Sequence, residues 1–158
     1  MAGNGDPDRL ILPEPEHLGY VTRDIERTKR NLQKILGLES FTMMAPDYFN
    51  KMYRGEPEDF KAQLAVCRVG NMVYELIQVL RGRTVYEEFL KEHGEGIHHL
   101  GYEISDLGRW VKAYERIGVK VAMSSERLAM SGERTGLKLA YLDTPGITVE
   151  LIERVPGT

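Results

Sequence analysis

Residues 97–107 read IHHLGYEISDL, and residues 16–25 read EHLGYVTRDI. The two segments share the motif His-Leu-Gly-Tyr, which begins at His17 and again at His99. In both segments an aspartate followed by an apolar residue comes shortly after the motif. A motif that recurs in the same local context is typical of an internal duplication, so we expect two similar modules in one chain.

A second repeat supports the duplication. Glu75 begins the run Glu-Leu-Ile, and Glu150 begins the same run again. The distance between the two glutamates is seven residues shorter than the distance between the two histidines of the first repeat. A longer loop in the first half explains this difference, and residues 45–61, which are polar and aromatic and contain proline, are expected to form it and to cover a site.

The same order of elements is expected in each copy. A helix over 24–36 is predicted from N-capping Asp24 to Gly37, and a second from Asp106 to Gly118, with Trp110 as an anchor on the sheet. The apolar residues at near-helical spacing are Ile25, Leu32, Ile35 and Leu36 in the first helix and Leu107, Trp110, Val111, Tyr114 and Ile117 in the second. The predicted strands are 39–43, 63–69 and 73–79 in the first copy, then 119–123, 137–142 and 148–152 in the second. The fold class is therefore α+β, with tandem β-α-β-β-β modules.

The expected organisation divides the chain into five parts. They are a flexible leader (1–14), the first module (15–80), a linker with a short helix (81–96), the second module (97–154) and a tail (155–158). Neither the leader nor any other stretch has the apolar length of a signal peptide or a membrane span, so no membrane partner is expected.

Composition narrows the function classes. The 158 residues are 42% hydrophobic, enough for an ordinary core, and 21 Lys+Arg against 24 Asp+Glu give a net charge of -3. No basic excess indicates a nucleic-acid partner. The single Cys67 cannot form an internal disulfide and lies in an apolar run typical of a core, so a reducing, cytoplasmic location is expected.

Four residues at duplicated positions are candidate metal ligands: His17, Glu75, His99 and Glu150. A single strand histidine is more often a surface or hydrogen-bonded core group, and a single strand glutamate more often lies on the solvated face. A glutamate in an apolar run is costly to bury unless something compensates its charge. Two imidazoles and two carboxylates around one divalent cation would compensate one another and leave positions for water or substrate. His98 is expected to point away from His99 because side chains alternate along a strand.

The motif HLGY, the strand ending YELIQ, the run EEFLKEHGEGIHHLGYEISDL and the closing VELIE resemble the vicinal oxygen chelate superfamily, which includes glyoxalases, bleomycin resistance proteins and dioxygenases. The resemblance covers residues 15–154, and the second module is most similar to methylmalonyl-CoA epimerases. It implies a curved, half-barrel sheet around one divalent ion (Co, Ni, Mn or Zn) held by His17, Glu75, His99 and Glu150.

The resemblance also implies an activity, the removal of a proton α to a carbonyl. Where the epimerases have a helping glutamate this chain has Gln63, so the role of base would pass to Glu150 or Glu75. The residues expected to bind substrate are Gln63, Arg127, Arg134 and Lys138. The substrate would be an acyl-CoA or a thiol adduct, and a homodimer is expected. The alternatives are a glyoxalase I-type lactoylglutathione lyase and a non-catalytic small-molecule-binding member of the superfamily.

Overall fold

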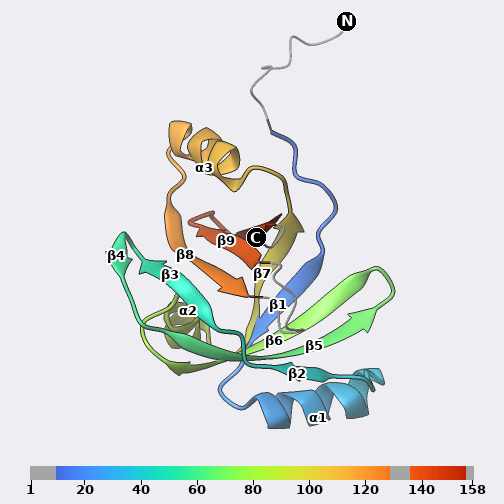
Figure 1. The fold of residues 1–158 in the computed structure, drawn as a ribbon. Coiled ribbons are helices and arrows are strands. Elements are labelled where there is room, and N and C mark those ends of the chain that lie inside the picture. The colour runs from blue at the N-terminus through green and yellow to red at the C-terminus, as the bar shows by residue number, and fades with distance from the viewer. Residues whose placement is uncertain (1–9, 129–135, 156–158) are drawn as a thin grey trace, which may run out of the picture.

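The computed structural model describes residues 10–128 and 136–155 of the chain. Within these residues ten strands form a single curled sheet, and three helices pack against it (Figure 1). The α+β class and the curved, half-barrel sheet expected from the sequence are confirmed.

The first half of the chain contributes one helix and six strands. They are β1 His17–Val21, α1 Ile25–Leu36, β2 Thr42–Met44, β3 Tyr48–Tyr53, β4 Glu56–Pro57, β5 Lys61–Val69 and β6 Met72–Arg81. The second half contributes α2 Val85–His93, β7 Gly96–Glu103, α3 Leu107–Arg116, β8 Val121–Leu128, β9 Gly136–Leu142 and β10 Thr148–Val155.

The strand order makes the duplication visible in space. The sheet runs β2-β5-β6-β1-β7-β10-β9-β8-β3-β4. In the first half β1 pairs parallel to β6, and in the second half β7 pairs parallel to β10 in the same way. The two halves meet where β1 pairs antiparallel to β7. The four consecutive strands around this junction, β6, β1, β7 and β10, therefore come two from each half.

The helix ends follow the capping signals of the sequence. Asp24 caps α1 by accepting from the Arg27 backbone N–H at 2.9 Å, and Gly37 ends the helix with φ 67°. Asp106 caps α3 by accepting from the Arg109 N–H at 3.1 Å. Ile35 and Leu36, which share the near-helical apolar spacing of the first helix, are exposed, with exposed fractions of 74% and 55%. Trp110 is buried against the sheet, as expected.

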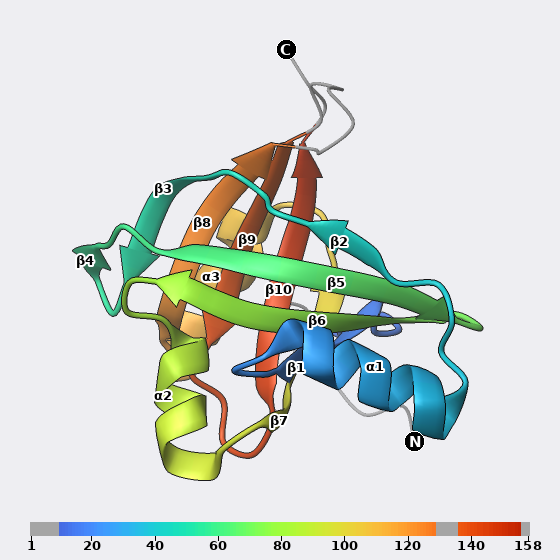
Figure 2. The same cartoon turned by 90° about the horizontal axis from the view of Figure 1, so that it is seen from below.

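The segment 45–61 is not only a covering loop, and this expectation is corrected. It contains β3 and β4, joined by a tight turn in which Arg54 and Gly55 both have positive φ. After β2 pairs with β5 at one end of the sheet, the chain crosses so that β3 pairs with β8 at the other (Figure 2). The first half thus reaches over and adds a hairpin to the edge of the second.

The two faces of the sheet bury different sets of apolar residues. On one face α1 packs on Ala65 and Leu76, while α3 packs through Trp110 on Leu142. The opposite face carries the largest core cluster, in which α2 contributes Val85, Tyr86 and Leu90. Cys67 is buried, as expected. Among the described residues, no helix has the length and apolar character needed to cross a membrane.

Candidate metal centre

The structure brings His17, Glu75, His99 and Glu150 together. They come from β1, β6, β7 and β10, which are four consecutive strands on either side of the β1–β7 junction. Their exposed fractions are only 6%, 7%, 0% and 3%. One ligand atom from each residue lies within 4.8 Å of the others, so the four could hold one ion.

The distances within the cluster are uneven. His17 Nε2 lies 3.1 Å from His99 Nε2. Glu150 Oε2 lies 2.7 Å from His17 Nε2 and 3.2 Å from His99 Nε2. Glu75 Oε2 is farther, at 3.6 Å and 3.9 Å from the same two nitrogens. Both histidines therefore direct Nε2 at a common point, and Glu150 lies closer to it than Glu75.

Two glycines make this convergence possible. In the antiparallel pair β1–β7, His17 is opposite Gly101 and Gly19 is opposite His99. A Cβ at Gly101 would overlap the His17 ring, and a Cβ at Gly19 would overlap the His99 ring. The imidazole of each module therefore lies over the glycine of the other, and glycine in a strand marks this kind of close approach. The Gly of the repeated HLGY motif is explained by the space that the rings need.

The charges of the cluster shift the pKa values of its members. Burial alone would lower the pKa of His17, but the negative charges of Glu75 and Glu150 and a hydrogen bond to Glu150 raise that pKa to about 9. Burial alone would raise the pKa of Glu150, but the charge of His17 and hydrogen bonds from both histidines hold it well below its usual range. In the metal-free protein a proton on His17 therefore compensates the buried carboxylates.

The residues present fit a divalent metal ion. Nitrogen and carboxylate oxygen donors suit first-row divalent ions, and four protein donors leave room for further oxygen ligands in a six-coordinate shell. Two carboxylates balance the charge of such an ion, which removes the need for the proton on His17. Gly19 and Gly101, here called the glycine cradle, leave the space in which both rings can direct Nε2 at one ion.

His98 does not point away from His99, and this expectation is wrong. Gly19 pairs with His99 and Tyr20 pairs with Ile97, so His98 is the extra residue of a β-bulge. A bulge interrupts the alternation of side chains and re-aims them. The His98 and His99 rings lie 5.2 Å apart, with their Nδ1 atoms at 3.0 Å.

Aromatic rings enclose the two histidines. Tyr86 of α2 lies 5.4 Å from the His98 ring, and Tyr141 of β9 lies 5.1 Å from the His99 ring. The hydroxyls of Tyr86 and Tyr141 are hydrogen-bonded to each other, and burial raises the pKa of both well above the usual value. Burial, with the nearby His99, lowers the pKa of His98 to about 3, so its ring is neutral. The sequence does not predict these neighbours, because neither the bulge nor the position of α2 has a periodic signal.

The residues expected to bind substrate are not brought to the cluster. Leu64 points from one face of β5 into the largest core cluster. Gln63 points from the other face, the one that carries Ala65 and is covered by α1. Gln63 therefore does not face the cluster, and its role in substrate binding stays a prediction. Lys138 is exposed, and it lies on the other face of β9 from Tyr141, so its side chain also points away from the cluster. Arg127 belongs to β8 by its backbone, its side chain is not among those described, and Arg134 lies outside the described residues.

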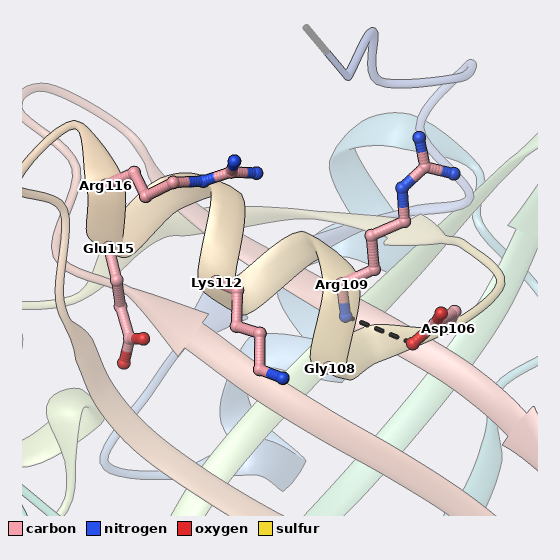
Figure 3. Close-up of a pocket in the computed structure, with 6 residues that line it drawn as sticks. All are labelled: Asp106, Gly108, Arg109, Lys112, Glu115 and Arg116. Atoms are coloured by element: carbon pink, nitrogen blue, oxygen red, sulfur yellow. Dashed lines mark hydrogen bonds between the residues drawn. The ribbon is translucent and has the colours of Figure 1, made fainter. Parts of the chain in front are cut away.

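Two hollows on the described surface are not lined by the four residues of the cluster. One of about 800 Å³ lies on α3, where charged side chains such as Arg109, Lys112 and Arg116 point in different directions (Figure 3). Because these side chains do not converge, we assign no chemistry to this hollow. Another, of about 370 Å³, is lined by Glu88, Phe89, His98 and Thr148 among others. His98, which lines this hollow, contacts His99 of the four-residue cluster.

A curved sheet built from two repeated units, the first with an added hairpin and each with two potential ligands, defines a class of paired-module proteins with a potential metal site at the junction. The family model described as the Glyoxalase/Bleomycin resistance protein/Dioxygenase superfamily matches residues 16–141. The chain belongs to this superfamily, and the resemblance drawn from the sequence is confirmed.

Individual relatives share only low sequence identity with this chain. The uncharacterized protein YqjC of Bacillus subtilis (strain 168) is 23% identical over 141 residues, covering 87% of this chain and 90% of that protein. A methylmalonyl-CoA epimerase of Streptomyces coelicolor, in complex with 2-nitronate-propionyl-CoA, is similar with a TM-score of 0.61 and 19% identity, covering 93% of this chain and 98% of that one. The methylmalonyl-CoA epimerase from Mycobacterium tuberculosis has a TM-score of 0.57 and 18% identity, with 94% and 95% covered. At these identities the solved structures show a shared fold.

Proposed function

We propose that this protein is a metal-dependent isomerase that removes and returns a proton α to a carbonyl, with an activity like that of methylmalonyl-CoA epimerase. The observation that carries the proposal is the buried convergence of His17, Glu75, His99 and Glu150. Four buried polar side chains at duplicated positions serve no packing purpose that apolar residues would not serve better. The similarity in fold to epimerases of two organisms supports the same reaction class.

The chemistry follows from the donor set. A divalent ion held there would place positive charge beside the substrate carbonyl oxygen and stabilise the negative charge that develops as the α-proton leaves. The chain itself must supply the base. Gln63 faces α1 and its amide is no base, so one of the two cluster glutamates must take the proton.

Geometry separates the two glutamates. Glu150 Oε2 lies within hydrogen-bonding distance of both His17 Nε2 and His99 Nε2, which suits a fixed ligand. Glu75 Oε2 lies beyond hydrogen-bonding distance of both nitrogens. We therefore assign Glu75 as the base that accepts and returns the proton, and Glu150 as a ligand that stays in place.

The substrate is proposed to be an acyl-CoA. One of the similar epimerase structures is a complex with methylmalonyl-CoA and NH4+, and it shares the fold with a TM-score of 0.60. The second candidate is a glyoxalase I-type isomerase that acts on a thiol adduct. The turn Asp143-Thr144-Pro145-Gly146 between β9 and β10 favours it, because its sequence is close to the corresponding hairpins of glyoxalase-like members.

One experiment tests both candidates. The metal-free protein is loaded in turn with Co²⁺, Ni²⁺, Mn²⁺ or Zn²⁺ and incubated in D₂O with methylmalonyl-CoA, or with methylglyoxal and glutathione. We expect metal-dependent loss of the α-proton signal of methylmalonyl-CoA in NMR spectra, and the variant Glu92→Gln, changed at an exposed side chain, should exchange like the wild type. Turnover of only the glyoxal adduct would select the second candidate. If neither substrate reacts with any of the four metals, both candidates are wrong.

The expected homodimer and cytoplasmic location stay predictions from the sequence. The choice among cobalt, nickel, manganese and zinc also stays open to the same metal series, because nitrogen and oxygen donors accept all four ions.

A further inference from the structure

We propose that His98 is a positioning residue of the metal centre, which accepts a hydrogen bond from His99 and thereby fixes the tautomer and orientation of that ligand. The inference rests on the proposed metal centre. It adds a residue outside the four ligands, whose role comes from a local irregularity of β7.

The hydrogen bond has only one possible direction when the cluster holds a metal. His98 Nδ1 and His99 Nδ1 are 3.0 Å apart, so one of them carries a proton and the other a lone pair. His99 Nε2 faces the cluster, 3.2 Å from Glu150 Oε2. A ligating nitrogen must be unprotonated, so the single proton of a neutral His99 ring lies on Nδ1. His99 is therefore the donor, and His98 Nδ1 is the acceptor.

The β-bulge is what places His98 for this task. Without the extra residue, side chains 98 and 99 would lie on opposite faces of β7. With it, the two rings meet nearly at right angles, with an interplanar angle of 84°. The rings of Tyr86 and Phe89, at 5.4 Å and 5.2 Å, fix His98 from the side of α2. Both histidines are buried, so water does not compete for the bond.

A neutral acceptor suits the charge of this site. A metal-ligating histidine usually donates its second N–H to a carboxylate, a backbone carbonyl or water. Glu75 and Glu150 already balance a divalent ion, and a third buried carboxylate would leave an uncompensated negative charge. A neutral imidazole orients His99 without adding that charge. Glu16 stands at the matching position of the first module, and its carboxylate pairs with Arg154 at 2.6 Å, so this device belongs to the second module.

Three substitutions of His98 separate the hydrogen bond from simple packing. In His98→Asn the amide oxygen takes the place of Nδ1 and keeps the acceptor. In His98→Gln the amide extends toward the position of Nε2 and leaves Nδ1 without a replacement. His98→Leu removes all polar atoms. His93→Gln is the matched control, because the His93 side chain is 60% exposed on the end of α2.

The readouts are the dissociation constant for Co²⁺ or Zn²⁺, from competition with a chromophoric chelator, and the visible absorption spectrum of the Co²⁺ form. We expect His98→Gln and His98→Leu to weaken metal binding by about 10- to 100-fold and to shift the Co²⁺ spectrum. His98→Asn and His93→Gln should stay close to wild type in both readouts.

Each other outcome has a definite meaning. Equal affinities and spectra in all variants would overturn the proposal, as would a loss in His98→Asn as large as that in His98→Gln. If His98→Leu does not fold, the Asn and Gln pair decides the question alone. If the wild type binds neither ion, the metal centre and the proposed function fail together, whereas wild-type binding with indifferent variants refutes only the role of His98.

Discussion

Gly101 of β7 lies directly opposite His17 of β1, and a Cβ on Gly101 would occupy the position of the His17 imidazole. The reciprocal pair, Gly19 with His99, has the same relationship. Each module therefore provides a histidine and also the space for the histidine of the other module. The four candidate ligands can therefore converge only when β1 and β7 pair in this register.

Gly101→Ala tests this dependence. The added methyl group must displace the His17 ring or the β1–β7 pairing, and overpacking of this kind typically costs about 1–3 kcal/mol. We expect a loss of unfolding free energy in that range in urea titrations, together with at least tenfold weaker metal binding. Gly96→Ala on the same strand is the control, because its Cβ would meet Phe89 at an ordinary 3.8 Å. Equal behaviour of the two variants would show that the glycine cradle is not needed.

The sequence predicted much of this centre because repetition carries its signal. The duplicated motifs located His17, Glu75, His99 and Glu150, and the capping residue Asp24 marked the start of α1. Each of these features can be recognised from a few neighbouring residues of the sequence. A strand pattern also fixes which face a residue occupies, provided that the strand is regular.

The sequence failed where tertiary structure decided the outcome. The β-bulge at His98 puts this side chain on the same side of β7 as His99, and no local sequence pattern predicts the bulge. The hairpin around Arg54 pairs with β8, far along the chain, so its strands have no partner that a local pattern could identify. Gln63 was expected at the site from its similarity to a family position, but its register with Gln78 places it on the face toward α1.

Glu75→Gln and Glu150→Gln should differ in kind if the two glutamates have the proposed roles. The change in Glu150 removes a charge close to both histidines, so we expect a large loss of metal affinity. The change in Glu75 should preserve most metal binding and slow α-proton exchange by about 10²–10⁴-fold, the usual contribution of a general base. Metal content and deuterium exchange are measured on the same samples. The reverse pattern would make Glu150 the base.

Arg54→Asn should loosen the β3–β4 hairpin at the edge of the sheet. Arg54 joins the hairpin to α2 through Glu88 at 2.7 Å and to the β9–β10 turn through Asp143 at 2.9 Å. These ion pairs are partly exposed, so their loss should lower the free energy of unfolding by no more than about 1 kcal/mol. Asparagine tolerates the positive φ of this position, which limits backbone strain.

The expected result for Arg54→Asn is several-fold faster extraction of bound metal by EDTA, followed by stopped-flow absorbance, with little change in stability. Lys29→Gln, which breaks the ion pair of Lys29 with Glu26 on α1, away from the hairpin, is the control. Similar extraction rates in the wild type and both variants would mean that the Arg54 ion pairs do not limit access to the centre.

The metal-free protein should lose stability as the pH rises from about 6.5 to about 9. The pKa of His17 is raised from 6.5 to about 9 in the folded protein, so a proton on its ring stabilises the fold. This contribution is fully present below the unfolded-state pKa of 6.5 and disappears as the pH passes the folded-state value. A shift of this size corresponds to at most about 3 kcal/mol. Urea unfolding in EDTA at several pH values measures it.

His17→Gln removes the titrating group and should flatten this dependence on pH. A bound divalent ion should flatten it too, because the ion replaces the proton between His17 and the two carboxylates. For the same reason metal binding should release a proton below about pH 9, and the apparent affinity for the metal should rise with pH. A metal-free wild type whose stability stays constant from about pH 6 to about pH 9 would contradict the assignment of the proton to His17.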